Sequence, residues 1–228
     1  MADQPPVSNR GPSRSAALVA ACRMLAAELP EDERLINDPF AHLVVDNRAI
    51  AAAREDEHLQ NVIRLRTRYI DDTVTSFIAA HAGHRPHVLL LGAGMDARAY
   101  RMDVDTLSPD AAFFEIDFPA TLELKGELLA GHTPAVQRTV VPVDLAEREF
   151  VEPLIGAGYD TDRPAIVVWE GVIHYLGRSD RQIRGRADRA CAVTRRAPRR
   201  RLRRDGVVQG LPVRTVDAHH LEERRRRR

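Results

Sequence analysis

The stretch "VLLLGAGMDARAY", residues 88–100, decides the fold class. Four apolar residues predict a short buried strand, and Gly92, Ala93 and Gly94 follow it as a tight turn. A strand that passes through a glycine turn into a helix is a common cradle for a nucleotide-like cofactor. The stretch therefore predicts the centre of an α/β domain, with Gly92 and Gly94 as cofactor-binding residues.

Strands and helices alternate around this turn. Further strands are predicted at residues 111–116, 136–143 and 165–169, and a helix that starts at a proline is predicted at residues 119–130. This order is typical of a doubly wound parallel sheet of Rossmann-like type. We assign residues 86–177 to this core.

The residues before the core are predicted to form a helical cap, residues 15–85. Apolar side chains recur at helical spacing from about residue 58 to residue 80. Ser15 is expected to be the N-cap of a first helix. The Asp38-Pro39 pair predicts the start of another short helix.

Charge is distributed unevenly over the 228 residues, although the formal net charge is only +1. Residues 1–177 carry 16 basic and 27 acidic side chains, whereas residues 178–228 carry 18 arginines and 6 acids. The second segment has no aromatic residue and no sustained apolar period, so we expect it to be a disordered tail. Residues 1–14, rich in polar residues and proline, are expected to be a flexible arm.

Two further hypotheses concern the arginine-rich tail. Its composition is that of a GC-rich gene read out of frame, which is our hypothesis for its origin. Arginines neutralise phosphates, so an arm that binds nucleic acid nonspecifically is the alternative. The tail lacks the interleaved aromatic residues that stack on bases, and no specific nucleic-acid partner is expected.

Composition also limits the cellular location. No run approaches the roughly 20 apolar residues that span a bilayer, and the N-terminus lacks the basic start of an export signal. Cys22 and Cys191 lie far apart and form no disulfide framework. We expect a cytoplasmic protein without a membrane partner.

Three histidines recur at every third position, at His81, His84 and His87. Metal binding by this group is an alternative, but Gly83 and Pro86 interrupt the helix that would align the three rings. We therefore expect no metal site.

The glycine turn by itself fits two cofactors. Residues 92–97 satisfy the dinucleotide pattern G-x-G-x-x-G/A, and Asp117 stands about 20 positions later, as that pattern requires. A dinucleotide would place its pyrophosphate at the helix N-terminus, where Asp96 would repel it. S-adenosylmethionine has no phosphate and carries an ammonium group that suits a nearby aspartate. A dehydrogenase and a turn without any ligand are the alternatives.

Acidic residues end successive predicted strands. Asp117 can accept hydrogen bonds from both hydroxyls of a ribose, and Glu115 is its rival for that role. Asp144 follows the next strand and can accept from an adenine amino group, with Leu145 framing the ring. Carboxyl ends of parallel strands meet at one edge of a sheet, so these residues predict an anionic rim that favours a cationic cofactor.

Six segments resemble the leucine carboxyl methyltransferase-like family of S-adenosylmethionine-dependent methyltransferases. They are "RLINDPFAHLV", "RLRTRYIDD", "LLLGAGMDARAYRM", "FFEIDFPATLELKGELL", "VPVDLAE" and "WEGVIHYL". They occur in the family's order over roughly residues 15–177. The resemblance implies a class I methyltransferase fold with an N-terminal helical cap.

The resemblance also implies roles for individual residues. By motif, the cofactor contacts are Gly92, Asp117, Asp144 and Leu145. Arg66 resembles the arginine that grips the cofactor carboxylate, with Arg68 as the near alternative. Glu170 resembles the acidic residue near the reacting end and is a candidate for both binding and catalysis.

The expected activity is O-methylation of a small molecule or a carboxylate. A carboxylate acceptor needs no general base, whereas a hydroxyl acceptor does. His174 follows Glu170 and is the candidate base, and Tyr175 is expected to be a wall of the pocket.

The end of the chain departs from the family pattern. A class I methyltransferase has about three more strands after the fourth, and residues 178–228 contain nothing that resembles them. We therefore expect residues 165–169 to form an exposed sheet edge and the substrate half to be missing. Truncation would then make this chain inactive. The alternative function is a non-catalytic remnant whose tail binds nucleic acid.

Overall fold

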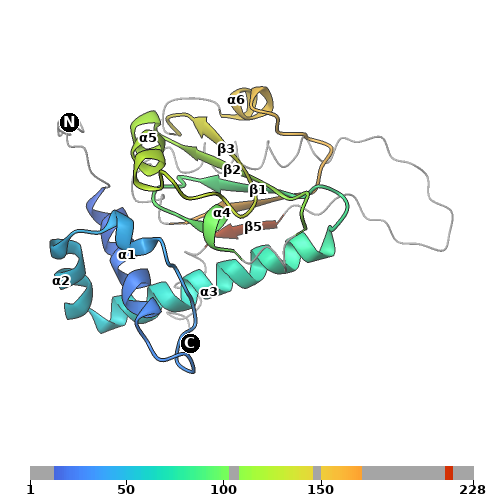
Figure 1. The fold of residues 1–228 in the computed structure, drawn as a ribbon. Coiled ribbons are helices and arrows are strands. Elements are labelled where there is room, and N and C mark those ends of the chain that lie inside the picture. The colour runs from blue at the N-terminus through green and yellow to red at the C-terminus, as the bar shows by residue number, and fades with distance from the viewer. Residues whose placement is uncertain (1–12, 103–107, 146–149, 171–213, 218–228) are drawn as a thin grey trace, which may run out of the picture.

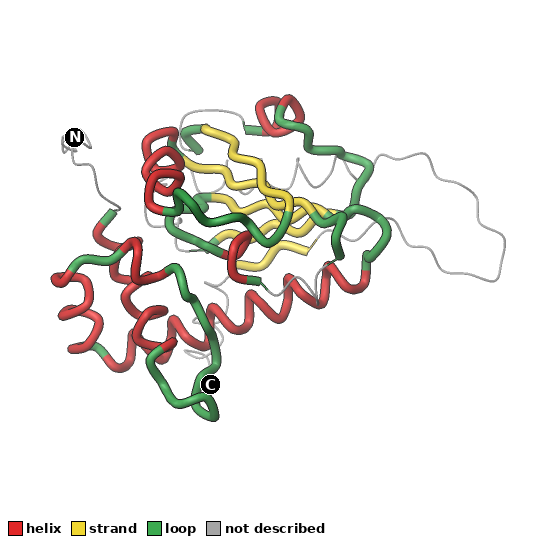
Figure 2. The backbone as a smooth tube through the Cα atoms, in the orientation of Figure 1, coloured by secondary structure: helices red, strands yellow, loops and turns green. Residues whose placement is uncertain are grey.

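The computed structural model describes residues 13–102, 108–145, 150–170 and 214–217. Figure 1 shows a group of helices at the N-terminal side and a sheet flanked by helices on both faces. Figure 2 separates the same parts by secondary structure, with the strands gathered in one layer. The predicted α/β class is confirmed.

The helical group consists of three α-helices and one 3₁₀-helix. These are α1 (Arg14–Ala27), η1 (Ala41–Val44), α2 (Asn47–Glu55) and α3 (Glu57–Ala80). Side chains of Ser13, Asp46 and Asp56 accept a backbone N–H at the start of α1, α2 and α3. Helical periodicity predicted α3 correctly, whereas α2 was not singled out.

One of the two local predictions in this region is wrong. The cap of α1 is Ser13 and not Ser15, because Ser13 Oγ accepts the Ala16 N–H at 3.2 Å. The Asp38-Pro39 pair is followed by a short helix, as predicted, and this helix is the 3₁₀-helix η1, which begins at Ala41. Asp38 is 3% exposed; its Oδ1 accepts the Phe40 N–H just before η1 at 3.2 Å, and its Oδ2 accepts from Arg23 Nε.

The sheet is fully parallel. Its strands are β1 (His87–Leu91), β2 (Ala112–Asp117), β3 (Gln137–Pro142), β4 (Ala165–Trp169) and β5 (Arg214–Asp217), in the order β3-β2-β1-β4-β5. Chain order reverses between β1 and β4, which is the topological switch point of a doubly wound sheet. Ligands of such sheets bind outside the carboxyl ends of the strands at that point.

The prediction that β4 would be an exposed edge is wrong. β5 pairs with it in parallel, from Ile166 opposite Arg214 to Trp169 opposite Asp217. β5 has only four residues and lies in an arginine-rich segment, so neither hydrophobic periodicity nor composition predicts it. The remainder of residues 178–228 lies outside the described residues, and its predicted disorder stays a prediction.

Both faces of the strands β1, β2 and β4 are buried, as expected of parallel strands, whereas the edge strand β3 is largely exposed. On one face, Ile70 and Val74 of α3 pack with Val88 and Leu90 of β1. On the other face, Leu89 belongs to a second cluster. That cluster also receives Phe150 and Leu154, from the segment around α6 (Val151–Gly156). The helix α5 (Pro119–Leu128) starts at a proline, as predicted.

Because α3 contributes to the sheet's core, the cap and the sheet are built on one shared helix. Its N-terminal part holds α1 and α2, and its C-terminal part covers the sheet (Figure 1). Side chains in the middle of α3 therefore lie between the cap and the carboxyl ends of the strands.

Candidate functional site

The glycine turn after β1 has the backbone that only glycine adopts easily. Gly92 has φ +66° and Gly94 has φ +45°, both in the left-handed region. The Gly92 N–H donates to the Ile116 carbonyl at 2.8 Å, and the Gly94 N–H donates to Asp117 Oδ2 at 2.6 Å. The turn is thus fastened to the end of β2, and it lies beside Asp117 as the sequence predicted.

Asp117 is half-buried and has two backbone donors. Besides the Gly94 N–H at Oδ2, the Phe118 N–H donates to Oδ1 at 2.6 Å. Burial raises the pKa of Asp117, and the two N–H donors only partly oppose that rise. A carboxylate has about four acceptor positions, so two remain for a ligand.

Phe118 is a residue that the sequence analysis missed. It follows Asp117 directly and is 51% exposed, although large aromatic side chains are usually well covered. An aromatic residue directly after a strand-ending aspartate was the available signal. Its exposed ring offers a flat apolar surface beside the carboxylate.

Glu115 does not compete with Asp117 for a ligand, contrary to the prediction. Its side chain is fully buried and pairs with Lys125 Nζ at 2.9 Å and with Arg138 Nη2 at 2.7 Å. Lys125, the only lysine of the chain, also donates to the Asp96 carbonyl and so ties α5 to the glycine turn. Glu115 lies deeper along β2 than Asp117, where α5 and β3 cover it.

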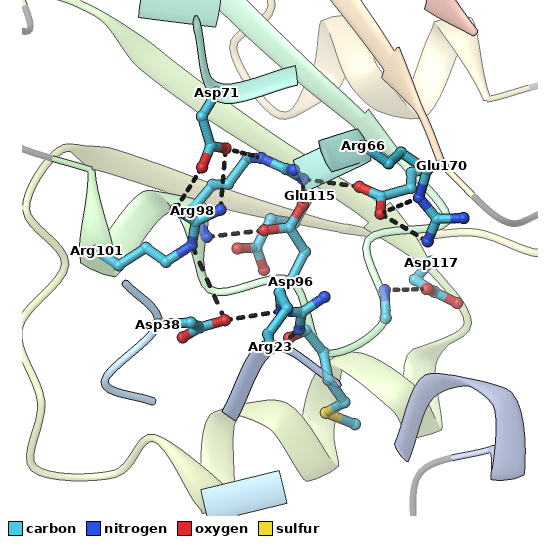
Figure 3. Close-up of polar contacts among 12 residues, drawn as sticks. Arg23, Asp38, Arg66, Asp71, Asp96, Arg98, Arg101, Glu115, Asp117 and Glu170 are labelled. Atoms are coloured by element: carbon cyan, nitrogen blue, oxygen red, sulfur yellow. Dashed lines mark hydrogen bonds and ion pairs between the residues drawn. The ribbon is translucent and has the colours of Figure 1, made fainter. Parts of the chain in front are cut away.

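Arginines and carboxylates alternate in a connected series, which we call the ion-pair chain (Figure 3). In order, its members are Arg23, Asp38, Arg101, Asp71, Arg98 with Asp96, Glu170 and Arg66. These four arginines and four carboxylates come from α1, the loop before η1, α3, the glycine turn, α4 (Arg98–Arg101) and the end of β4. The chain is electrically balanced.

The first half of the ion-pair chain joins the cap to the sheet. Arg23 Nε pairs with Asp38 Oδ2 at 2.8 Å, and Arg23 Nη2 donates to the Met95 carbonyl in the glycine turn at 2.9 Å. Arg101 Nε lies 3.9 Å from Asp38 Oδ2, and Arg101 Nη1 lies 2.7 Å from Asp71 Oδ2. The position of the glycine turn is therefore coupled to α1.

Arg98 is the centre of the second half. Its side chain is 1% exposed, and its Nε donates to Asp71 Oδ1 at 2.7 Å. Its Nη1 donates both to Asp96 and to Glu170 Oε2, which lies 3.1 Å away. Burial alone would lower the pKa of Arg98, but the carboxylates of Asp96, Glu170 and Asp71 outweigh it and raise that pKa. Arg98 therefore stays charged.

Asp96 does not present a free charge to a ligand, contrary to the prediction. Its Oδ1 accepts the Arg98 N–H at 2.8 Å, and its Oδ2 pairs with the Arg98 guanidinium. Burial opposes ionisation of Asp96, yet Arg98 and Arg101 lower its pKa to about 2. The negative charge of Asp96 is thus neutralised within the ion-pair chain.

Glu170 and Arg66 meet at the end of β4. Arg66 Nε and Nη2 each lie 2.9 Å from Glu170 Oε1, while Arg98 takes Oε2. Burial would raise the pKa of Glu170, but the guanidinium groups of Arg98 and Arg66 outweigh it and hold that pKa below its usual range. Arg68, the alternative to Arg66, is exposed and pairs with Asp72 at 2.8 Å on the outer face of α3.

The remaining predicted residues lie apart or outside the description. Asp144 is half-buried just after β3, and Leu145 is 4% exposed in the core beside it. His174, Tyr175 and Cys191 lie outside the described residues. Within the described ranges, no helix has the length and apolar character needed to cross a membrane.

The three histidines do not converge on a metal. His87 is buried at the start of β1 against Phe114 and Tyr159, and burial lowers its pKa to about 4. His81 Nδ1 lies 2.7 Å from the Phe77 carbonyl at the end of α3. Among the residues that the structure describes, no three His, Cys, Asp or Glu side chains are grouped to hold a metal ion.

Comparison with known proteins agrees with this architecture. A protein from Mycobacterium marinum is 37% identical over 177 residues, and one from Mycobacteroides abscessus is 34% identical over 175 residues. Both are named "Putative S-adenosyl-L-methionine-dependent methyltransferase". Each alignment covers 69% of this chain and 54% of the relative, so the chain spans about half the length of these curated relatives.

A solved structure supports the fold alone. A crystal structure from Thermobifida fusca, described as "a putative methyltransferase", superposes with a TM-score of 0.52 at 19% identity. The match covers 83% of this chain and 66% of that one. The family model for leucine carboxyl methyltransferase matches residues 16–183, most of the chain. The chain belongs to the leucine carboxyl methyltransferase family.

Proposed function

We propose that this protein binds S-adenosylmethionine at the carboxyl ends of β1, β2 and β4 and methylates an oxygen atom of a small acceptor, with a carboxylate as the first acceptor class to test. The observation that carries the proposal is the Arg66–Glu170 pair, with 2.9 Å between the two charged groups. It lies at the switch point of the sheet and is joined to the glycine turn through Arg98 and Asp96.

A paired arginine and glutamate fit the amino-acid end of this cofactor. That end carries a carboxylate and an ammonium on one carbon atom, so it needs one cation and one anion side by side. Arg66 supplies the first and Glu170 the second. The lowered pKa of Glu170 keeps it ionised at neutral pH and makes it a weak base, so we assign it to binding rather than to proton removal.

The other end of the cofactor fits the edge near β2 and β3. Asp117 has acceptor positions left for the ribose hydroxyls, and the exposed ring of Phe118 can stack on a base. Asp144 and Leu145 follow β3 at the same edge of the sheet and suit the adenine amino group and ring. Asp117 suits the ribose of either cofactor, so the preference for S-adenosylmethionine over a dinucleotide rests on the Arg66–Glu170 pair, which fits an amino-acid end.

When bound, the cofactor supplies an activated methyl group on a sulfonium. This chain's residues would hold both ends of it and so fix the direction of the methyl group toward an acceptor, and alignment of this kind accounts for much of the rate in such displacements. A carboxylate acceptor requires no base, which suits a site in which Glu170, at the end of β4, is already bound by two arginines.

Calorimetric titration of the full chain tests the proposal. Wild-type protein should bind S-adenosylmethionine and its demethylated product, S-adenosylhomocysteine. Arg66→Met should weaken binding about 10-fold to 100-fold, because charge-assisted hydrogen bonds contribute about 1.5–3 kcal/mol. Arg68→Met is the matched control, since Arg68 lies two residues away on the exposed face, and it should bind as wild type does.

Three results of that titration would contradict the proposal. Absence of heat with either ligand would contradict the assignment of S-adenosylmethionine as the cofactor. Equal losses of affinity in Arg66→Met and Arg68→Met would contradict the role assigned to Arg66. Binding of NADH instead would indicate a dehydrogenase.

The acceptor class needs a separate assay. Methyl transfer from labelled cofactor to a panel of carboxylic acids should give esters, which mild alkali hydrolyses with release of labelled methanol. Alkali-stable label would indicate an ether and hence a hydroxyl acceptor, which needs a base.

Nucleic-acid binding by the arginine-rich segment is the second candidate. Residues 178–228 carry 18 arginines against 6 acids, and that surplus is the observation in its favour. Salt-sensitive DNA binding without any cofactor binding would support this candidate over the methyltransferase.

A further inference from the structure

We propose that Arg98 is a positioning residue: it holds Glu170 in place while the Arg66–Glu170 pair opens to admit the amino-acid end of the cofactor. The inference rests on the proposed function and deepens it. No residue role carried over from the family motifs involves Arg98. Figure 3 shows the contacts around its guanidinium group that support this role.

The two oxygens of Glu170 have different partners. Oε1 lies 2.9 Å from both Arg66 Nε and Arg66 Nη2, and Oε2 lies 3.1 Å from Arg98 Nη1. Arg66 has a side chain that is 19% exposed, whereas that of Arg98 is 1% exposed. The partner at Oε1 can therefore leave, while the partner at Oε2 is enclosed.

Arg98 is itself anchored from two further sides. Its Nε donates to Asp71 Oδ1 at 2.7 Å, and its Nη1 also donates to Asp96, two residues after Gly94. Asp71 in turn is held by Arg101, whose Nη1 and Nη2 lie 2.7 and 2.9 Å from its two oxygens. A planar guanidinium with fixed donors transmits this rigid placement to Glu170.

Charge balance explains why the exchange is favourable. In the ligand-free arrangement Arg66 and Glu170 neutralise each other. When a zwitterion enters, its carboxylate takes Arg66 and its ammonium takes Glu170 Oε1, so one ion pair is replaced by two and no charge is left alone. Without Arg98, Glu170 would be free to follow Arg66, and the two halves of the zwitterion site would not stay apart.

The same geometry predicts which ligands depend on Arg98. S-adenosylhomocysteine carries the amino-acid end, whereas 5′-methylthioadenosine has the same nucleoside and sulfur without it. An effect that passes through Glu170 must weaken the first ligand and spare the second. A purely structural role of Arg98 would weaken both ligands alike.

The test is a double-mutant cycle on the full chain, with affinities measured by calorimetry. Arg98→Lys keeps the positive charge but loses the planar fork, and Glu170→Gln removes the charge that Arg98 is proposed to place. We expect Arg98→Lys to weaken the binding of S-adenosylhomocysteine about 10-fold in the wild-type background and less than about 2-fold in the Glu170→Gln background. Binding of 5′-methylthioadenosine should change less than about 2-fold in every variant.

Each other outcome overturns the inference. If Arg98→Lys weakens both ligands equally, Arg98 only supports the fold. If its effect on S-adenosylhomocysteine persists in the Glu170→Gln background, Arg98 does not act through Glu170. If wild type and Arg98→Lys bind S-adenosylhomocysteine equally, the proposed function stands and the inference alone fails, whereas absence of binding to wild type overturns both.

A second variant covers the case in which Arg98→Lys does not fold. Asp71→Asn weakens the anchor at Arg98 Nε and leaves the Arg98–Glu170 contact in place. It should show the same selective loss of S-adenosylhomocysteine at a smaller factor, with 5′-methylthioadenosine unaffected. Equal loss of both ligands in this variant would contradict the inference.

Discussion

Replacing Glu115 by glutamine is expected to cause one of the largest stability losses available in this fold. Glu115 is fully buried in β2 and neutralises two cations, Lys125 at 2.9 Å and Arg138 at 2.7 Å. Glutamine has nearly the same shape, so the change removes the charge without creating a cavity. Lys125, with a side chain 1% exposed, would then retain only the Asp96 carbonyl as a described partner.

The magnitude follows from the burial of the partners. Breaking a buried ion pair from one side costs about 3–5 kcal/mol, because the remaining charge has lost its partner and cannot reach water. Glu115→Gln should lie in that range, a large share of the roughly 5–15 kcal/mol that stabilises a typical domain. Lys125→Met should cost less, since Glu115 then keeps Arg138, whose side chain is 14% exposed.

Urea unfolding monitored by circular dichroism measures these differences. The double variant Glu115→Gln/Lys125→Met should be less destabilised than the sum of the single variants, because both charges of the pair are removed together. Asp72→Asn is the control: it breaks the exposed Arg68–Asp72 pair and should cost less than about 1 kcal/mol. A Glu115→Gln protein within about 1 kcal/mol of wild type, or a greater loss for Lys125→Met, would refute the reasoning.

Three further predictions test separate features. The pKa of His87 is about 4 in the folded protein, against an ordinary value of 6.5, so the unfolded state takes up the proton first as the pH falls. The free energy of unfolding should therefore fall by up to about 3 kcal/mol between pH 6.5 and pH 4. The urea midpoints at pH 7 and pH 4.5 should lie closer together in His87→Phe than in wild type, and an equal decline in both proteins would contradict the assignment. Gly94→Ala should lower the free energy of unfolding by about 1–2 kcal/mol because of the positive φ of +45°, since the new Cβ would meet only Gly92 O at 3.8 Å and has no clash. Gly126→Ala in the helix α5 should instead stabilise the protein, and the same sign for both changes would refute the backbone argument. Phe118→Ala should change the free energy of unfolding by less than about 0.5 kcal/mol yet weaken the binding of S-adenosylhomocysteine about 10-fold, as measured by calorimetry. An unchanged affinity would exclude stacking of the base on Phe118.

Local sequence patterns were enough to predict most strands of the sheet and the helix α3. The apolar run of β1 and the helical spacing before it reflect neighbours in the sequence, so each segment predicts its own conformation. The same holds for Gly92 and Gly94, whose positive φ values follow from the turn chemistry. Short elements escaped this reasoning: α6 has six residues and β5 has four, too few for a period to show.

Charged side chains could be assigned to the correct edge of the sheet but not to their partners. Asp117 was placed by its position at the end of a strand, and Arg66 was chosen by its motif. Glu115 and Asp96 were expected to face a ligand and instead are neutralised by Lys125 and Arg98. No sequence pattern distinguishes an acid that faces a ligand from one that is covered by a neighbouring helix, because that depends on how α5 and α4 pack.

By itself the sequence determined the α/β class, the glycine turn and the row of acidic residues at the strand ends, since periodicity and turn chemistry are local properties. Only the tertiary structure decided which of those acids remain available, because ion-pair partners are selected by packing across long separations. Arg66 and Glu170 are 104 residues apart, and Arg23 reaches a carbonyl 72 residues away. The ion-pair chain exists only once α1, α3 and the ends of β1 and β4 have been brought together by burial of their apolar faces.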